Sequence, residues 1–150
     1  MKNKAFTLIE LLVVIAIMTI LIGLSAFGLQ QARESARDGQ RKSDLETIRT
    51  GLSFYKADCN AYPTPTSGDF KTVIGTSLVG VAASCGGTAN TYIAKVPSDP
   101  VPGNLYYFSS TGTTYYICAS LETGDAVAVA GCPSGSTGCG GYCNYIVTNP

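Results

Sequence analysis

The chain has 150 residues, and its ten Lys and Arg side chains balance ten Asp and Glu side chains at a formal net charge of zero. This balance excludes the strongly positive net charge that would indicate nucleic-acid binding by bulk electrostatics. No His is present, which excludes Ser-His and Cys-His catalytic pairs and zinc sites built with imidazole. The length leaves room for a single small domain beside one long helix.

A long apolar stretch lies near the N-terminus, at residues 6–29. Fifteen of its residues are Leu, Ile, Val or Phe, and Glu10 is its only charged residue. As an α-helix it would extend about 36 Å, enough for a hydrocarbon core of about 30 Å. Its apolar side chains favour insertion by roughly 7 kcal/mol in sum, against about 3 kcal/mol opposing it from one acid. The stretch is therefore predicted to span a membrane, and the carboxylate within it needs an explanation.

Two interpretations of this N-terminus compete. In the first, it is an ordinary secretory signal, with Lys2 and Lys4 as the basic region and cleavage after residues 23–25. In the second, cleavage falls before the apolar stretch, which is retained. Glu10 favours the second interpretation, because intramembrane acids are rare and usually have a partner.

Residues 5–14, with the sequence AFTLIELLVV, resemble the processing site of class III signal peptides, which are found in type IV pilins and type II secretion pseudopilins. The resemblance implies that a prepilin peptidase removes a leader, residues 1–5, by cutting between Ala5 and Phe6, and that Phe6 is then N-methylated. It also implies that Glu10 serves assembly by pairing with the N-terminal ammonium of a neighbouring subunit. One position differs, because the family usually has Gly where this chain has Ala5.

The helix is predicted to continue through residues 30–59. Residues 30–44 are polar and contain no Pro, and we interpret their charged side chains as a solvated face. Apolar residues then return at intervals of three and four and make one stripe: Leu45, Ile48, Leu52, Tyr55 and Cys59. We expect this stripe to pack on a sheet, and the helix to end near residues 58–60, before Pro63.

Residues 60–150 form the predicted head. The Pro- and Gly-rich residues 60–104 are expected to be a long connection with short ordered pieces. Strands are predicted at residues 105–109, 114–120 and roughly 126–130, the first two as a hairpin, with an edge strand at 143–148. The expected fold class is α+β. A long N-terminal helix, hydrophobic in its first half and amphipathic in its second, packs on a small antiparallel β-sheet head.

Six cysteines follow the apolar stretch, which predicts disulfides and an oxidising compartment. They are Cys59, Cys85, Cys118, Cys132, Cys139 and Cys143. Six cysteines allow fifteen complete pairings. Cys59 with Cys85 is favoured because both flank the loop after the helix, and the other four are expected to pair among themselves. No metal site and no cofactor are predicted, and Asp99, Glu122 and Asp125 are expected to be exposed turn acids. The resemblance to secretion pseudopilins leaves open a calcium loop at Glu122 and Asp125 as the alternative.

The predicted function is structural and not enzymatic: a subunit of a type IV pilus-like filament or a type II secretion pseudopilus. The expected partners are copies of the chain, a prepilin peptidase that also methylates, an assembly platform and, before assembly, the membrane; no nucleic acid is indicated. The head is expected outside the cytoplasmic membrane, and the filament in the periplasm or outside the cell. The alternative is a single-pass anchored extracytoplasmic binding module that does not polymerise. A secreted enzyme would need cleavage near Ser25 and a catalytic site that the sequence does not suggest.

Overall fold

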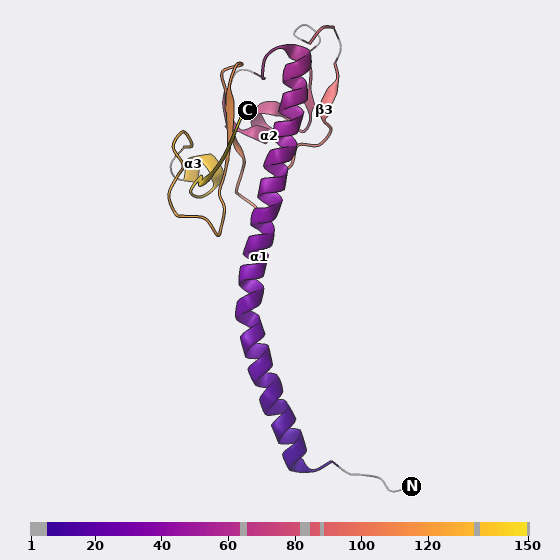
Figure 1. Cartoon of the computed structure of the whole chain (residues 1–150), viewed down its shortest axis with the longest axis vertical. Coiled ribbons are helices and arrows are strands. Elements are labelled where there is room, and N and C mark those ends of the chain that lie inside the picture. The colour runs from indigo at the N-terminus through magenta and orange to yellow at the C-terminus, as the bar shows by residue number, and fades with distance from the viewer. Residues whose placement is uncertain (1–5, 64–65, 82–84, 88, 134–135, 150) are drawn as a thin grey trace, which may run out of the picture. The chain divides into compact units, whose positions relative to one another are not determined.

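The computed structural model describes residues 6–63, 66–81, 85–87, 89–133 and 136–149, so the predicted leader with Ala5 lies outside the described residues. The chain divides into two compact units, Met1–Ala36 and Arg37–Pro150, each of which is described by itself. Helix α1, Leu8–Cys59, contributes to both units (Figure 1).

The first unit is the apolar part of α1. Its large apolar side chains between Phe6 and Leu29 are 46–82% exposed where they are described, so no protein core covers them. Among the described helices, α1 alone is long and apolar enough to cross a membrane, judged by length and composition. Signal sequences pass the same test, so this property does not by itself choose between the two interpretations of the N-terminus.

The second unit contains a four-stranded antiparallel sheet with the order β1-β4-β5-β6. The strands are β1 (Thr66–Asp69), β4 (Tyr107–Ser110), β5 (Tyr115–Ala119) and β6 (Tyr145–Thr148). β4 and β5 form the predicted hairpin, with Ser110 opposite Tyr115. β6 is the predicted edge strand, because it pairs with β5 alone. The sheet and α1 together give the predicted α+β class.

The prediction of a strand at residues 126–130 is wrong, because these residues lie outside the strands of the structure. The place beside β5 that it would need is taken by β6. The Val129 N–H donates to the Cys143 carbonyl over 2.9 Å, and the Cys132 N–H donates to the Val129 carbonyl over 3.0 Å. These hydrogen bonds turn the chain back on itself instead of extending it along a strand.

The long connection contains more order than its composition indicates. β1 joins the main sheet through β4, and the short helix α2 (Phe70–Ile74) follows it directly. A second sheet pairs β2 (Leu78–Val79) with β3 (Thr91–Ile93) in antiparallel orientation. The Phe70 N–H donates to the Tyr106 carbonyl over 2.7 Å, and the Phe70 ring lies edge-on to Phe108. The connection is therefore anchored to the main sheet where it enters α2.

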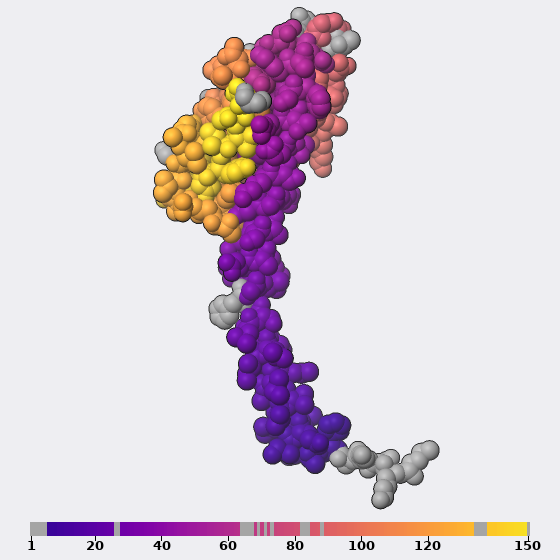
Figure 2. Space-filling view, in the orientation of Figure 1, coloured from indigo at the N-terminus to yellow at the C-terminus, as the bar shows by residue number. Residues whose placement is uncertain are grey.

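The predicted apolar stripe of α1 is confirmed as the centre of the core. Its five members, Leu45 to Cys59, are no more than 7% exposed and belong to one cluster with the side chains of the main sheet. The opposite face of this half of α1 stays at the surface, between the C-terminal residues in yellow and those around β3 in pink (Figure 2). Phe54, on that face, is 60% exposed. After Cys59 the left-handed backbone of Asn60, at φ 57°, ends the helix.

A third layer covers the face of the main sheet that α1 does not cover. It contains α3 (Ser136–Cys139), which lies on the far side of the sheet from α1 (Figure 1). Cys118, Cys139 and Cys143 are wholly buried there against Tyr107, Tyr116 and Ile146. This layer has little regular secondary structure in the part of the chain that the structure describes, so its disulfides and side-chain hydrogen bonds hold it together.

Candidate functional site

The N-terminus of α1 is closed by a capping box made by Thr7 and Glu10. The backbone N–H and the hydroxyl of Thr7 both donate to Glu10 Oε2, over 2.9 and 2.7 Å. In return the Glu10 N–H donates to Thr7 Oγ1 over 3.3 Å. The Leu11 N–H donates to the Thr7 carbonyl over 3.3 Å, which is the first hydrogen bond of the helix. Thr7 is therefore the N-cap residue, and Leu8 is the first helical residue.

This capping box changes the interpretation of the acid in the apolar stretch. A carboxylate at the start of a helix satisfies backbone N–H groups and lies at the positive end of the helix dipole. Both bonds from Thr7 end on Oε2, and Oε1 accepts no hydrogen bond from the described residues. One carboxylate oxygen thus caps the helix, while the other remains open to a cation. The sequence singled out Glu10 but not Thr7, although the spacing T-x-x-E was the available signal.

Apolar side chains surround this carboxylate. Phe6 lies outside the helix and is 81% exposed, and Ile9, Val13 and Val14 border the same shallow surface. The residue on the other side of the expected cleavage site, Ala5, lies outside the described part of the chain. The site therefore combines one capped carboxylate with an apolar surface that requires cover.

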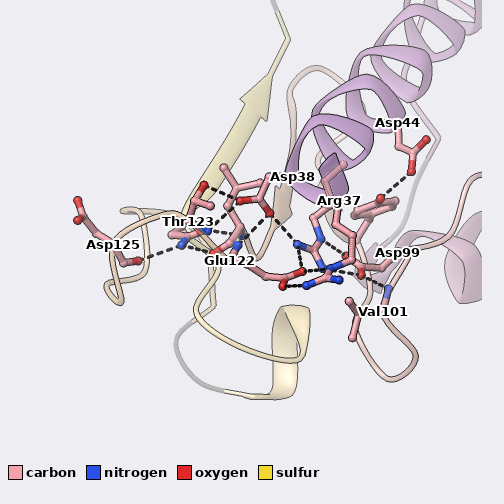
Figure 3. Close-up of polar contacts among 12 residues, drawn as sticks. Arg37, Asp38, Asp44, Asp99, Val101, Glu122, Thr123 and Asp125 are labelled. Atoms are coloured by element: carbon pink, nitrogen blue, oxygen red, sulfur yellow. Dashed lines mark hydrogen bonds and ion pairs between the residues drawn. The ribbon is translucent and has the colours of Figure 1, made fainter. Parts of the chain in front are cut away.

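A second group of charged residues lies in the other unit, and we call it the charge cluster: Arg37, Asp38, Arg41, Asp99 and Glu122 (Figure 3). The Arg41 guanidinium, wholly buried, donates Nε and Nη2 to the two oxygens of Asp99 over 2.8 and 3.0 Å. Its Nη1 donates to Asp38 over 2.7 Å and to Glu122 over 2.8 Å. Arg37 donates to both oxygens of Glu122. One buried cation thus joins α1 to two loops.

Asp38 fixes the second of these loops to α1. Its carboxylate accepts the N–H of Glu122 over 2.9 Å, and the N–H and hydroxyl of Thr123 over 2.8 and 2.7 Å. Burial acts to raise the pKa of Asp38, but the hydrogen bonds from Thr123, Glu122 and Arg41 outweigh it and lower that pKa to about 2. The Arg37 guanidinium is the main reason that the pKa of Glu122 lies below its ordinary value.

The charge cluster corrects two expectations. The predicted solvated face of residues 30–44 fails at Asp38 and Arg41, which are 3% and 0% exposed. Asp99 is not a solvated turn acid either, because its side chain is wholly buried against Arg41. Both failures have one reason: three carboxylates from separate segments neutralise one guanidinium, and a cation so paired can be buried.

The acids considered for calcium do not converge on one point. The Glu122 carboxylate binds Arg37 and Arg41, whereas Asp125 is engaged through its backbone carbonyl, which accepts the Asn144 amide over 2.9 Å. Within the described ranges, no group of three His, Cys, Asp or Glu side chains is arranged to hold a metal ion.

The structure joins all six cysteines in pairs. They are Cys59–Cys85, Cys118–Cys132 and Cys139–Cys143. The first pair ties the end of α1 to the connection, and the other two lie in the third layer. The head therefore contains disulfides, as the cysteine count indicates.

Comparison with known proteins agrees with the N-terminal motif. Residues 1–26 match the family described as "Prokaryotic N-terminal methylation motif". The chain is 33% identical over 111 residues to the type II secretion system core protein G of Escherichia coli K12, covering 74% of each chain. It is 34% identical over 113 residues to that of Aeromonas hydrophila, covering 74% of this chain and 76% of the relative. No solved structure matches the chain.

A long N-terminal helix that packs on a small antiparallel sheet and begins with this motif defines a protein of the type IV pilin and pseudopilin superfamily. Within that superfamily, the chain belongs to the family of type II secretion system core protein G.

Proposed function

We propose that this chain is a structural subunit of a type II secretion pseudopilus, a filament held together by the N-terminal helices of many copies. The observation that carries the proposal is the exposed apolar surface of α1, whose large apolar side chains described between Phe6 and Leu29 are 46–82% exposed, with a capped carboxylate at its start. Lipid covers such a surface in a membrane, and outside it only other apolar surfaces can. Contact between two different faces of identical subunits propagates as a helical filament when its rotation does not close a ring.

The first step of the proposed mechanism is processing. A prepilin peptidase cuts between Ala5 and Phe6 while Lys2 and Lys4 hold the leader on the cytoplasmic side. The cut leaves an α-ammonium on Phe6, and N-methylation keeps its positive charge. The head lies outside the cytoplasmic membrane at this stage, and an assembly platform then extracts the subunit.

The second step is pairing between subunits. In the apolar filament core, the Phe6 ammonium of one subunit binds Glu10 of its neighbour, and Oε1 is the oxygen left open by the capping box. At an effective dielectric constant of about 20, opposite charges 4 Å apart attract by about 4 kcal/mol. Such a pair fixes the axial register of the helices as well as adding to their association.

The test separates the charge of Glu10 from its capping role. Glu10→Gln keeps a side chain that caps a helix from this position but removes the charge, and Glu10→Leu removes both. We expect both variants to reach the membrane fraction in normal amounts and to yield few or no sheared filaments. Losing one member of a buried ion pair costs about 3–5 kcal/mol, and the loss recurs at every subunit that is added.

Thr7→Ser is the matched control, because it keeps both the charge and the capping hydroxyl, and it should give normal filament yields. Normal filament yields from Glu10→Gln would show that the charge of Glu10 is not used in assembly. Mass spectrometry of the exported protein tests processing independently. A mature chain starting at Phe6 supports the filament subunit, one starting at Met1 supports the anchored module, and one starting at Ala26 supports secretion.

A further inference from the structure

The segment between β5 and β6, residues 120–144, contains three cysteines that form disulfides, although little of the segment is regular secondary structure. Its described residues contain one short helix, α3. Its cysteines pair with each other and with Cys118 of β5. Four cysteines allow three complete pairings. For flexible loops the entropy of closure changes slowly with loop length, so chain length alone does not fix which pairing forms.

The start of this segment is anchored to α1 by the charge cluster (Figure 3). Asp38, which is 3% exposed, accepts three hydrogen bonds from Glu122 and Thr123. The Glu122 side chain binds Arg37 and Arg41 at the same place. These contacts involve no sulfur atom, so they fix the backbone a few residues after Cys118 independently of any disulfide.

The end of the segment is anchored to its start by Asn144. The Asn144 Oδ1 accepts the Leu121 N–H over 2.7 Å, and its Nδ2 donates to the carbonyls of Leu121 and Asp125, each over 2.9 Å. A side chain at position 124 would overlap the Asn144 amide, so the Asn144 side chain can take this place only beside a glycine. Cys143 is the residue before Asn144, and the amide therefore holds it beside the start of the segment.

Two backbone hydrogen bonds extend this arrangement from Cys143 to Cys132. The Val129 N–H donates to the Cys143 carbonyl, and the Cys132 N–H donates to the Val129 carbonyl, over 2.9 and 3.0 Å. Together they turn the chain so that Cys132 faces β5. Cys118, Cys132 and Cys143 are thus placed by contacts that do not depend on their own disulfides.

We infer that the Asp38 and Asn144 anchors direct the oxidative folding of the head, because they bring Cys132 to Cys118 before that bond forms and so leave Cys139 to pair with Cys143. A disulfide compound such as oxidised glutathione is the oxidant. One cysteine thiolate attacks it and releases a glutathione thiolate. The second cysteine then attacks the mixed disulfide and releases another. Two protein thiols become one disulfide, and their two electrons and two protons leave with two molecules of reduced glutathione.

The experiment follows disulfide pairing during refolding of the full chain in detergent micelles. Reduced, denatured protein is refolded in a glutathione redox buffer, quenched with acid at intervals, alkylated and mapped by mass spectrometry. For Asp38→Ala and Asn144→Ala, we expect the ratio of non-native to native pairs among the four cysteines to rise about fivefold or more. Loss of about 1 kcal/mol of anchoring corresponds to that factor.

Gly124→Ala is the variant that guards against simple unfolding, because it displaces the Asn144 amide from an exposed loop without removing a donor or an acceptor. It should shift the pairing in the same direction. Asp44→Ala is the matched control: this residue of α1 accepts a hydrogen bond from Tyr106, which lies outside residues 120–144. It should give the native pairs. Cys59–Cys85 should form at the native rate throughout.

Native pairing in Gly124→Ala and in both anchor variants would overturn the inference. Scrambling that includes Cys59–Cys85, or that Asp44→Ala produces equally, would also overturn it, because it would show a general loss of folding and no specific direction of pairing.

Discussion

At the scale of single residues, Arg41 shows how a charge can be placed in a small head. Its guanidinium is wholly buried and meets carboxylates from α1 and from two loops. A buried charge is tolerated only when it is paired and its hydrogen bonds are satisfied. Here the guanidinium donates to carboxylate oxygens of Asp38, Asp99 and Glu122. Arg41 therefore acts as an internal counter-ion that holds separate segments on one helix.

The acid side of this cluster gives a pH prediction for Asp38. Its pKa in the folded protein is about 2, below the ordinary value of 3.8. A carboxyl group whose pKa is lower in the folded than in the unfolded protein stabilises the folded state at pH values above its unfolded pKa. That stabilisation is lost as the pH falls towards the folded pKa. For Asp38 it is complete above about pH 4 and is worth roughly 2 kcal/mol.

We expect Asp38→Asn to lower the free energy of unfolding by about 2 kcal/mol at pH 5–7, with the deficit shrinking as the pH falls to 2. Urea unfolding of the native protein and of Asp38→Asn, in detergent at several pH values between 2 and 7, measures this deficit. Asp44→Asn is the control, because burial raises the pKa of Asp44. The free energy of unfolding of this variant relative to the native protein should therefore fall on acidification, whereas that of Asp38→Asn should rise. A deficit in Asp38→Asn that stays constant down to pH 2 would contradict the assignment.

At the scale of secondary-structure elements, the local patterns of apolar and aromatic residues predicted helix α1 and the β4–β5 hairpin correctly. The stripe from Leu45 to Cys59 predicted the buried face of α1, and the Tyr-rich residues predicted the β4–β5 hairpin, because both signals depend on neighbouring residues. β1 was missed because it is short and depends on pairing with β4, far along the chain. The strand predicted at residues 126–130 failed for a related reason: edge positions are assigned by competition between strands.

Two glycines of α1 test the packing of this helix. A Cβ on Gly51 would overlap the Ile93 side chain of β3, whereas nothing lies within 4 Å of the same position on Gly39. Ala is favoured over Gly in a helix by about 1 kcal/mol, while overpacking a core costs about 1–3 kcal/mol. Gly39→Ala should therefore stabilise the protein by up to about 1 kcal/mol.

Gly51→Ala should instead destabilise it, so that the two variants differ by about 1–3 kcal/mol. Chemical unfolding of both proteins side by side is the measurement. Since both changes make the same chemical replacement in one helix, their difference reports on the contact with β3. Equal stabilities would show that Ile93 moves aside without cost.

At the scale of the whole molecule, the sequence predicted those features that are recognisable from single residues or residue counts. Glu10 was conspicuous because a charge in an apolar stretch is unusual, and the six cysteines indicated disulfides by their number. The partners of Arg41 could not be predicted, because Asp99 and Glu122 lie far along the chain and only the fold brings them together. Asn144 was missed for the same reason, since one amide that bonds to backbone groups leaves no pattern in a sequence.

The last prediction concerns metal ions and the loop that follows β5. The backbone of residues 121–125 is held by Asp38 and Asn144, and Glu122 binds two guanidiniums. Two positive charges beside the Glu122 carboxylate oppose the approach of a calcium ion, whose ligands would have to be carboxylate and carbonyl oxygens. The stability of the head should therefore not depend on calcium.

We expect the thermal unfolding midpoint of the full chain in detergent to be the same in excess chelator and in millimolar calcium. A ligand that binds only the folded state raises the midpoint as its concentration rises above its dissociation constant, so millimolar calcium would reveal even a weak site. Asn144→Ala provides the positive control, because it removes three hydrogen bonds from this loop and should lower the midpoint in both buffers. A calcium-dependent rise in the native protein would mean that metal ligands and not side-chain anchors hold the loop.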